Sequence, residues 1–520
     1  MILASASPRR KELLERAGFQ LTIEPADVNE TRLPHERPQD LVLRLATSKA
    51  RACLELHPYL DEDDVILAAD TIVWLDDTVL GKPADEDDAC RMLHALSGKT
   101  HHVSTGVCLL TETGSIQERA FVETTDVTFK SLTDEEINAY VATGEPLDKA
   151  GSYGIQGGAG SFVCRLDGDY DNVVGLPIAH VLGELMQMGL GPTPTSVNRI
   201  PGILAAHDTD TVGGTGCTVI ICPDGATGAV DVRGGAPATR ETDLLRPEET
   251  VQQLNAVVLA GGSAFGLAAS CGVADELERQ GIGLDVGVTR VPIVSGACLF
   301  DLMVGDPTVR PTLESGVRAA QAALAERNAL APLRSPLARG NVGAGTGCSV
   351  GKFAELSRAM KSGLGEAVEA SGRLVCGAVA AVNACGDVVN PETGEPIAGL
   401  LSADGNRIED SAQLLRNLTA TMPLERTNTT ISCVVTNARL TKAEATKVAQ
   451  MAADAYAHAL RPAHSTNDGD TIFVMATGEV TAPVDAVGTL ATHALERAIA
   501  DGARQATSAF GLISAHEIAR

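Results

Sequence analysis

The first eighteen residues carry the apolar pattern of a short buried strand followed by a helix. The opening MILA is apolar throughout, which favours a strand that is covered on both faces. After it, Ser7 is a good N-cap residue, Pro8 suits the first helical position, and Leu13 and Leu14 supply an apolar face. Gly18 is a typical residue at the end of a helix. The pattern therefore predicts an N-terminal strand and a helix that begins at Pro8.

Three cations, Arg9, Arg10 and Lys11, occupy the first turn of this helix. A helix N-terminus carries partial positive charge, so each cation there is unfavourable by roughly 0.3–1 kcal/mol. A strand, a serine-containing turn and a helix N-terminus with two arginines together form a site where N–H groups and guanidinium groups converge on phosphate oxygens. We therefore predict an anion site here. The alternative is that the arginines point into solvent.

The apolar stretch VILAADTIVWL predicts a buried strand that is interrupted by Asp70 and Thr71. A carboxylate in an apolar strand is costly unless it pairs with a cation or binds a metal ion. Candidate partners are Lys82, in a turn before an amphipathic helix, and Lys149, in the glycine-rich GEPLDKAGSYGIQGGAG that also holds Gln156. These stretches are candidate pieces of one site.

In the second half of the chain, the β-branched run TTISCVV predicts another buried strand. Its first residue, Thr429, follows Asn428. An Asn-Thr pair before a strand is commonly an ordinary turn. If the bond between these residues were cut, Thr429 would offer a hydroxyl beside its own α-amine, whose pKa of about 8 suits a base at neutral pH. The pattern alone leaves both interpretations open.

Three glycine clusters in this half suggest motifs that they do not complete. NVGAGTGCSVGKF is not a P-loop, because Thr346 stands where glycine is required and Phe353 follows the lysine. LAGGSAFG is not a nucleophile elbow, because Phe265 replaces the second glycine. Tight turns are the simpler interpretation of these clusters.

The composition indicates several globular α/β domains. A chain of 520 residues that is 44% hydrophobic is expected to form two to four domains. Glycine, proline and threonine crowd together around residues 189–202, so we predict domains over 1–188 and 198–520 with a linker over 189–197. The net charge of −26 argues against general binding to nucleic acids or anionic membranes.

The cysteines and the apolar runs bear on the cellular compartment. The twelve cysteines are scattered without metal-binding spacing, which favours reduced, mostly buried thiols. The sequence has no run of eighteen apolar residues, and charge follows the opening MILA directly, unlike a signal peptide. We therefore expect a cytoplasmic protein without a membrane partner.

Residues 1–188 resemble the Maf family of nucleoside triphosphate pyrophosphatases. Five motifs occur in the family's order: SASPRR, AADT, GKP, DKAGSYGIQG and NVVGLP. The resemblance implies a two-lobed α/β domain with a central cleft and cleavage between the α and β phosphates with a divalent metal. It also implies that Asp70 accepts a proton and that Arg9, Thr71 and Gln156 select the base. The motifs are similar to those of the dTTP/UTP branch.

The chemistry of this reaction assigns roles to further residues. Attack on the α-phosphorus requires a positioned water, a base or metal to deprotonate it, and cations that stabilise the leaving pyrophosphate. Glu30 and Asp70 are candidate metal contacts, and oxygen ligands favour Mg²⁺ or Mn²⁺. The candidate cations for the pyrophosphate are Arg9, Arg10, Lys49, Lys82 and Lys149.

Residues 198–520 resemble the P1 peptidase family, a self-processing aminopeptidase and amidase group that includes L-aminopeptidase/D-esterase and nylon-oligomer hydrolase. Among the matching stretches are VVLAGGSAFGLAA, NVGAGTGCSVGK, NTTISCVVTNA and NDGDTIFVMATG. The resemblance implies an αββα sandwich and self-cleavage between Asn428 and Thr429, with Thr429 as the nucleophile. It also implies that Asn383 is an oxyanion donor beside three polar groups, Lys352, Asp468 and Asp470.

We interpret the sequence as a fusion of two hydrolases. The predicted substrates are dTTP and UTP for the first domain and a small amide or peptide for the second, which needs no cofactor. We also expect a homo-oligomer. Two alternatives remain: only one half is active, or the first half binds a triphosphate without cleaving it. The sequence specifies neither the amide substrate nor the reason for the fusion.

Overall fold

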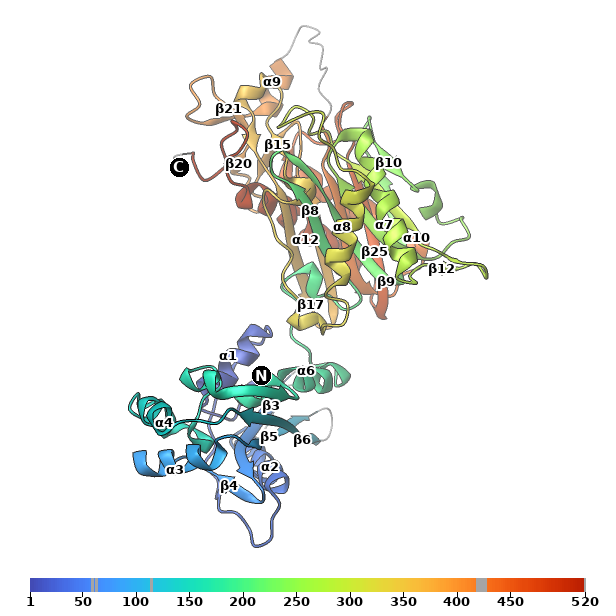
Figure 1. Cartoon of the computed structure of the whole chain (residues 1–520). Coiled ribbons are helices and arrows are strands. Elements are labelled where there is room, and N and C mark those ends of the chain that lie inside the picture. The colour runs from blue at the N-terminus through green and yellow to red at the C-terminus, as the bar shows by residue number, and fades with distance from the viewer. Residues whose placement is uncertain (58–59, 61–63, 113–115, 418–427, 519–520) are drawn as a thin grey trace. The chain divides into compact units, whose positions relative to one another are not determined.

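The computed structural model describes residues 1–57, 60, 64–112, 116–417 and 428–518. The chain forms two compact units, Met1–Thr193 and Pro194–Arg520 (Figure 1). The division falls inside the segment 189–197 that the sequence predicts as a linker. None of the described helices is both long enough and apolar enough to cross a membrane.

The first unit is built on a seven-stranded mixed sheet with the order β2-β1-β3-β5-β6-β7, in which β4 pairs with β3. Strands β1, β2 and β3 run parallel, and β3, β5, β6 and β7 are antiparallel neighbours. The strands are β1 Ile2–Leu3, β2 Thr22–Ile23, β3 Ile66–Leu75, β4 Thr78–Leu80, β5 Thr100–Glu112, β6 Ile116–Phe129 and β7 Val163–Asp167.

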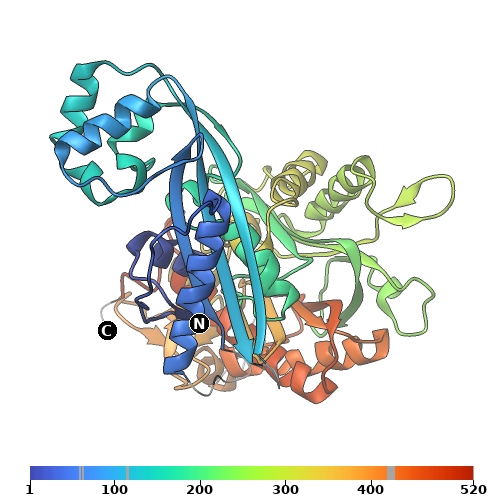
Figure 2. The ribbon, with the colours of Figure 1, turned by 90° about the horizontal axis from the view of Figure 1, so that it is seen from below.

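The described part of this unit has six α-helices, and the long strands run between two groups of them (Figure 2). Separate hydrophobic clusters lie toward the two ends of these strands. One cluster packs α3 and α4 against the end of β3, and the other packs α2 against its beginning. This is the two-lobed α/β arrangement expected from the sequence, and the central cleft stays a prediction. The helices are α1 Pro8–Arg16, α2 Pro38–Leu56, α3 Glu86–Leu96, α4 Asp134–Val141, α5 Tyr170–Val174 and α6 Ile178–Gln187.

The predicted N-terminal strand and helix are confirmed, with one correction to the cap. The helix begins at Pro8 and buries Leu13 and Leu14. Ser7 stands at the N-cap position with extended backbone, but among the described residues its side chain makes no capping hydrogen bond. Instead, the Ser7 N–H donates to the Ser5 hydroxyl at 3.3 Å. The orphan N–H groups of this helix therefore remain available to a ligand.

The second unit contains a nine-stranded sheet with the order β10-β14-β11-β9-β25-β23-β18-β17, in which β8 pairs with β9. The strands are β8 Leu204–Asp210, β9 Thr215–Val232, β10 Thr239–Arg240, β11 Leu254–Ala260, β14 Val294–Cys298, β17 Leu364–Ser371, β18 Leu374–Ala381, β23 Ile431–Ala438 and β25 Thr471–Val480.

The long strand β9 belongs to both halves of this sheet. Its first part pairs with β11, from Cys217 to Ala226, and its second part pairs with β25, from Thr227 to Val232. The two halves can therefore fold face to face while they share one strand.

Three hydrophobic cores show that the two halves of the sheet do stack. Side chains from β9, β11, β18, β23 and β25 form a central core between the halves. The alternate side chains of the same strands pack outward, on one side against α7 and α8 and on the other against α10, α11 and α12. In β9, for example, Ile220 lies in the central core and Ile221 in an outer one. This is the αββα sandwich that the sequence resemblance implies.

The two outer faces are covered by α7 Ala268–Arg279 and α8 Leu313–Leu324 on one side and by α10 Lys442–Ala452, α11 Asp454–Ala459 and α12 Val484–Gln505 on the other. The short helix α9 Ser411–Asn417 lies apart from these faces and is held by hydrogen bonds from Ser411 to the Asp387 carboxylate. Four small sheets complete the described part of the unit, with the orders β12-β13, β15-β16, β20-β19-β24 and β21-β22. Their strands are β12 Leu284–Asp285, β13 Arg290–Val291, β15 Ser349–Val350, β16 Met360–Lys361, β19 Asp387–Val389, β20 Pro396–Ala398, β21 Leu400–Leu401, β22 Ile408–Glu409 and β24 Leu460–Arg461.

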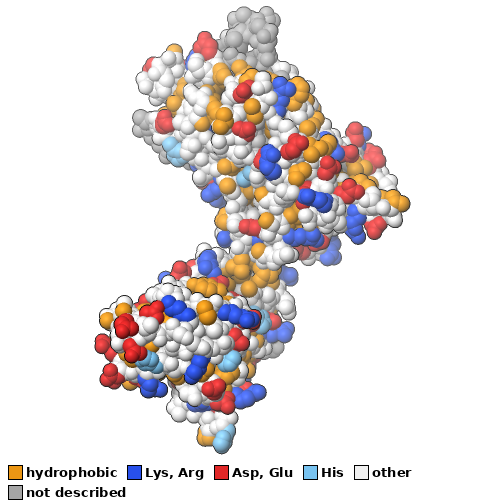
Figure 3. All heavy atoms as spheres, in the orientation of Figure 1, with side chains coloured by type: hydrophobic (Ala, Val, Ile, Leu, Met, Phe, Trp, Pro, Cys, Tyr) orange, Lys and Arg blue, Asp and Glu red, His pale blue; other side chains and the backbone are white. Residues whose placement is uncertain are grey.

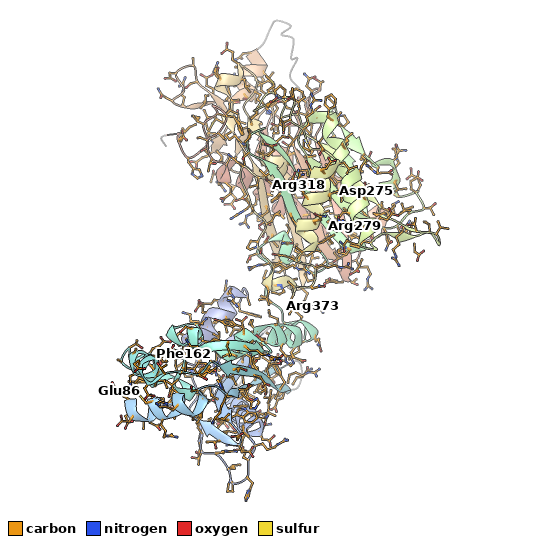
Figure 4. All side chains as sticks on the ribbon, viewed as in Figure 1. Glu86, Phe162, Asp275, Arg279, Arg318 and Arg373 are labelled. Carbon is orange, nitrogen blue, oxygen red and sulfur yellow. The ribbon has the colours of Figure 1, made fainter. Side chains whose placement is uncertain are left out.

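Charged side chains project from the outer helices. On the face shown in Figure 3, acidic and basic side chains are interspersed over the described parts of both units. Asp275 and Arg279 project from α7, and Arg318 projects from α8 (Figure 4). The Arg318 guanidinium pairs with the Asp208 carboxylate of β8 at 2.7 Å, which ties α8 to the sheet.

A buried carboxyl group in β17 makes the stability of the second unit depend on pH. Glu366 is 7% exposed and accepts hydrogen bonds from the Ser196 hydroxyl (2.9 Å) and the Val197 N–H (3.0 Å). Burial raises the pKa of Glu366 from 4.5 to about 7, against the effect of these bonds. The folded state binds this proton more tightly than the unfolded state does. The contribution of Glu366 to the free energy of unfolding is therefore full below pH 4.5 and is lost as the pH rises through 7.

The stability of Glu366→Gln relative to wild type is therefore expected to be higher at pH 8 than at pH 5. The amide is neutral at both values, so it avoids the cost of a buried charge, which is about 1.4 kcal/mol per unit of pKa shift. Thermal unfolding of both proteins at the two pH values measures this. A difference in Tm between variant and wild type that does not change with pH would contradict the prediction.

Candidate active sites

In the first unit, the predicted anion site is organised around Arg10. Its guanidinium donates to the Thr71 hydroxyl at 3.0 Å, to the Ser5 hydroxyl at 3.0 Å and to the Gly175 carbonyl at 2.9 Å. The Thr71 hydroxyl also lies 2.9 Å from the Thr105 hydroxyl. Three sequence motifs, SASPRR, AADT and NVVGLP, therefore meet at one arginine.

Asp70 lies beside this network and is paired with Lys49. The Lys49 ammonium contacts Asp70 Oδ1 at 2.7 Å and Glu30 Oε1 at 2.6 Å. Lys49 comes from α2 and Asp70 from β3, and both side chains are largely buried. Burial lowers the pKa of Arg10, and the charges of Asp70 and Glu30 oppose that shift. Two carboxylates and two cations therefore form one electrostatic cluster.

This cluster fits the predicted divalent metal in its donor chemistry. Glu30 and Asp70 both direct a carboxylate oxygen at Lys49 Nζ, so their oxygens converge on one point. Oxygen donors of this kind suit Mg²⁺ or Mn²⁺. Lys49 holds the two carboxylates together in the structure described here.

Arg9 and Lys149 belong to a second cluster, formed by the glycine-rich segment. The Lys149 ammonium donates to Asp148 Oδ1 at 2.6 Å and to the Glu145 carbonyl at 2.8 Å. Pairing with Lys149 lowers the pKa of Asp148, and the charge of Arg9 adds to that shift. The Glu145 side chain accepts from the Gly158 N–H at 3.1 Å, which orders the segment.

A side chain at position 157 of this segment would displace the Glu145 carboxylate. A Cβ atom there would lie only 1.9 Å from Glu145 Oε1. The neighbouring Gln156 is exposed, as is Lys82 in its turn. Of the residues predicted for the first site, Arg10, Thr71, Lys49, Asp70 and Glu30 therefore form one cluster, Arg9 and Lys149 form the other, and Lys82 and Gln156 face solvent.

The two arginines are expected to respond differently to substitution. Arg10→Ala removes three hydrogen bonds, each worth roughly 0.5–1.5 kcal/mol, so it should lower the Tm as well as triphosphate hydrolysis. Arg9→Ala removes a cation that is unfavourable at a helix N-terminus, so the Tm should not fall. The loss of its charge near the phosphates should raise the KM for triphosphate. Thermal unfolding and steady-state kinetics separate the two outcomes. Equal losses of Tm in both variants would refute the distinction.

In the second unit, Thr429 lies between two buried residues directly before β23. Asn428 and Thr429 are 1% and 4% exposed, and the Thr429 hydroxyl contacts the Asn428 carbonyl oxygen. The Thr429 N–H donates to the Asn383 carbonyl at 3.1 Å. The hydroxyl thus lies next to the carbonyl that it is predicted to attack, and the amide nitrogen of the same bond is held in place.

A backbone N–H group donates to the carbonyl that would be attacked. The Gly469 N–H lies 2.9 Å from the Asn428 carbonyl oxygen. A Cβ atom at Gly469 would lie 2.8 Å from the Thr429 hydroxyl, so only glycine allows this approach. An N–H group in this position stabilises negative charge that develops on the oxygen.

The Asn383 side chain has other partners in the structure. Its amide nitrogen donates to the Phe300 carbonyl at 2.8 Å, and its oxygen accepts from the Lys352 ammonium (2.7 Å) and the Ser349 N–H (3.1 Å). Because both of these partners are donors, the oxygen must face them. The role of Asn383 as an oxyanion donor stays a prediction, and the structure shows that Asn383 anchors Lys352.

Lys352 and Asp468 are two buried titratable groups of this site. Burial lowers the pKa of Lys352 to about 8, although the charges of Asp468 and Asp301, among others, oppose the shift. Burial also raises the pKa of Asp468, and the charge of Asp470 adds to this. Asp468 Oδ2 accepts from the Ser465 N–H at 2.7 Å, whereas its buried Oδ1 has no hydrogen-bond partner among the described residues.

Asp470 holds the residue that follows the nucleophile. Its Oδ1 accepts from the Thr430 N–H at 2.9 Å, and its Oδ2 accepts from the His464 N–H at 3.0 Å and lies 2.9 Å from His464 Nδ1. The His464 ring stacks on Tyr456 with 5.2 Å between ring centroids. Asp470 therefore links the start of β23 to the loop that carries Asp468 and Gly469.

Several residues of these sites are absent from the sequence-based prediction. Ser5 lies in the motif SASPRR and Gly175 lies in NVVGLP, so the motifs themselves could have indicated both residues. Gly469 lies in NDGDT and His464 lies shortly before it. Both donate a backbone N–H group, which every residue except proline has, so the residue type does not indicate this role. Their contribution follows from the register between the 465–470 loop and the start of β23.

Comparisons with known proteins match both halves of the chain. The family model described as Maf-like protein matches residues 1–188, and the model described as Peptidase family S58 matches residues 196–516. A dTTP/UTP pyrophosphatase of Bacillus cytotoxicus is 51% identical over 190 residues, which cover 36% of this chain and 96% of that protein.

Two further relatives are a curated protein and a solved structure. A dTTP/UTP pyrophosphatase of Bacillus cereus is 50% identical over 193 residues, which cover 37% of this chain and 97% of that protein. A solved beta-aminopeptidase of Burkholderia sp. aligns with a TM-score of 0.45 and 19% identity over 62% of this chain and 90% of that one. The family matches confirm both resemblances drawn from the sequence motifs.

Proposed function

The chain belongs to the Maf-like family through residues 1–188 and to peptidase family S58 through residues 196–516, and we propose that it is a hydrolase with two activities. The first unit hydrolyses dTTP and UTP to the monophosphate and pyrophosphate. The second unit cuts its own chain and then hydrolyses a small amide or peptide.

The observation that carries the first activity is the Arg10–Thr71 and Lys49–Asp70 cluster, in a domain about 50% identical to dTTP/UTP pyrophosphatases over nearly their whole length. Asp70 accepts the proton of the attacking water. The water oxygen bonds to the α-phosphorus, and the bond from that phosphorus to the bridging oxygen breaks. Arg10, Lys49 and the helix N-terminus of α1 stabilise the charge on the phosphates.

Metal binding and base selection rest on the same residues. Glu30 and Asp70 would hold a divalent cation, which neutralises phosphate charge and acidifies bound water when present. Arg9, Thr71 and Gln156 are the positions that we assign to recognition of the base. Lys82 and Lys149 are the remaining cations available to the pyrophosphate.

The test of this activity is the product formed from UTP. Purified protein with Mg²⁺ or Mn²⁺ should release UMP and pyrophosphate, measured by chromatography and by a pyrophosphate-specific assay. Orthophosphate as the direct product would refute cleavage between the α and β phosphates. Binding of UTP without any product would instead identify a nucleotide-binding module.

The second activity rests on the contact between the Thr429 hydroxyl and the Asn428 carbonyl, which also accepts the Gly469 N–H. The Thr429 oxygen attacks this carbonyl carbon, the peptide C–N bond breaks, and the hydroxyl proton passes to the released α-amine. Water then hydrolyses the resulting ester and leaves a carboxylate on Asn428. The free Thr429 is then the nucleophile for external amides, with its own α-amine as base.

The environment of Thr429 supports this proposal. Lys352, Asp468 and Asp470 surround the residue with buried charge, and Asn383 fixes Lys352. We propose that both activities operate in the cytoplasm and in a homo-oligomer. All twelve cysteines are free and nine are buried, which supports a reducing compartment.

A further inference from the structure

Three side chains of mixed ligand type meet at the C-terminal end of α2, outside the cluster around Arg10 and Asp70. Cys53 lies in the last turn of α2, and His57 is the C-cap residue that directly follows this helix. Glu24 follows β2 directly and completes the group. One ligand atom from each of the three residues lies within 4.8 Å of the others.

We propose that Glu24, Cys53 and His57 bind a borderline-soft divalent cation such as Zn²⁺. A thiolate, an imidazole and a carboxylate are the three ligand types that Zn²⁺ accepts in proteins. Three protein ligands leave one tetrahedral position for water. This donor set differs from the pair Glu30 and Asp70, which offers oxygen atoms only. The first unit would therefore have one site that favours Mg²⁺ or Mn²⁺ and a second site that favours Zn²⁺.

The burial of the three residues is consistent with entry of a cation from the surface. Cys53 is fully buried in the core beneath α2, whereas the side chains of His57 and Glu24 are 25% and 33% exposed. These two partly exposed side chains contact each other directly, and the thiol lies close to both. A cation would therefore replace the contact between the imidazole and the carboxylate and reach the sulfur beneath it.

Proton release accompanies binding at this site. Burial raises the pKa of the Cys53 thiol, and the charge of Glu24 adds to that shift. The cation must displace the thiol proton when it binds the sulfur.

The site would stabilise the helix that carries Lys49. Cys53 is one helical turn after Lys49 on α2, and Lys49 holds Asp70 and Glu30. A cation that joins the C-terminal end of α2 to the end of β2 binds only the folded state, so it raises the Tm in proportion to its occupancy.

Titration of the full-length protein with Co²⁺, a spectroscopic substitute for Zn²⁺, tests the proposal. A thiolate-to-cobalt charge-transfer band should appear in the near ultraviolet and disappear when Zn²⁺ is added. Cys53→Ser should abolish the band, and Glu24→Gln should weaken Co²⁺ binding by at least about tenfold. The matched control is Cys108→Ser, because Cys108 is buried in the same core but is not a ligand, and it should keep the band.

Thermal unfolding gives a second readout that does not depend on catalysis. Zn²⁺ should raise the Tm of wild type and of Cys108→Ser, and should have no such effect on His57→Gln. Absence of the charge-transfer band in wild type, or a band that persists in Cys53→Ser, would overturn the proposal. A rise in Tm with Zn²⁺ that is equal in wild type and His57→Gln would also overturn it.

Discussion

Asp70→Asn is expected to lower hydrolysis of UTP and dTTP by roughly 10²–10⁴-fold, the range associated with loss of a general base. The asparagine has the same shape as the aspartate and can still accept a hydrogen bond from Lys49. It cannot take a proton from water, and it provides no charge for a divalent cation. Steady-state rates of pyrophosphate release, with saturating metal and UTP, measure the effect.

The control for this substitution is Asp126→Asn in the same sheet. Asp126 lies on β6 and pairs with His102 at 2.6 Å, outside the cluster around Arg10. It should keep the wild-type rate. Both variants should keep the wild-type Tm of the first unit, which shows that the unit carrying the substitution is folded. An Asp70→Asn protein with the rate of wild type would exclude Asp70 both as the base and as an essential metal ligand.

Much of the architecture can be predicted from the sequence because it depends on local periodicity. Pro8 and the pair Leu13 and Leu14 define α1 by capping and amphipathic spacing. In β23, Cys433 and Val434 point to different cores, as the period of two requires. The two lobes and the αββα layers follow from family resemblance, since no local pattern specifies how strands from distant segments pair.

The sites could be predicted only in part, because their geometry depends on contacts between distant segments. The sequence predicts that Asp70 needs a cation, and it points to Lys82 and Lys149 as candidates. The structure instead pairs Asp70 with Lys49, which lies on a different element, and Lys82 is exposed. The choice among lysines depends on which helix packs against β3, and residue spacing does not encode that packing.

Asn383 illustrates a different limit. A resemblance assigns a role to a residue, but the hydrogen bonds of that residue depend on all its neighbours. Here two donors, Lys352 and the Ser349 N–H, fix the direction of the Asn383 amide. The Gly469 N–H, which no side-chain pattern indicates, is the group that donates to the Asn428 carbonyl.

Thr429→Ala is expected to leave a single uncut chain without amidase activity. The nucleophile and the carbonyl that it attacks belong to adjacent residues, so no association entropy is lost in bringing them together. Removal of the hydroxyl therefore removes the reaction rather than slowing it. Denaturing gel electrophoresis and intact mass should show one species for the variant and two for wild type, the smaller one beginning at Thr429.

The chain offers a matched control in the next residue. Thr430 is also buried, and its hydroxyl has no hydrogen-bond partner among the described residues. Thr430→Val preserves the shape of the side chain and the N–H that donates to Asp470. Removing an unpaired buried hydroxyl carries no desolvation penalty, so this variant should be folded, cut and active. Both variants should hydrolyse UTP at the wild-type rate.

The position of the cut decides between a nucleophile at Thr429 and an unrelated protease-sensitive site. A contaminating protease could also cut the chain at another bond. Such a cut would persist in Thr429→Ala, whereas cleavage by the Thr429 hydroxyl would not. A wild-type fragment that begins at any residue other than Thr429, or a wild-type chain that stays intact on long incubation, would refute the assignment. The second unit would then lack the base that activates Thr429, because the free α-amine exists only after the bond between Asn428 and Thr429 is cut.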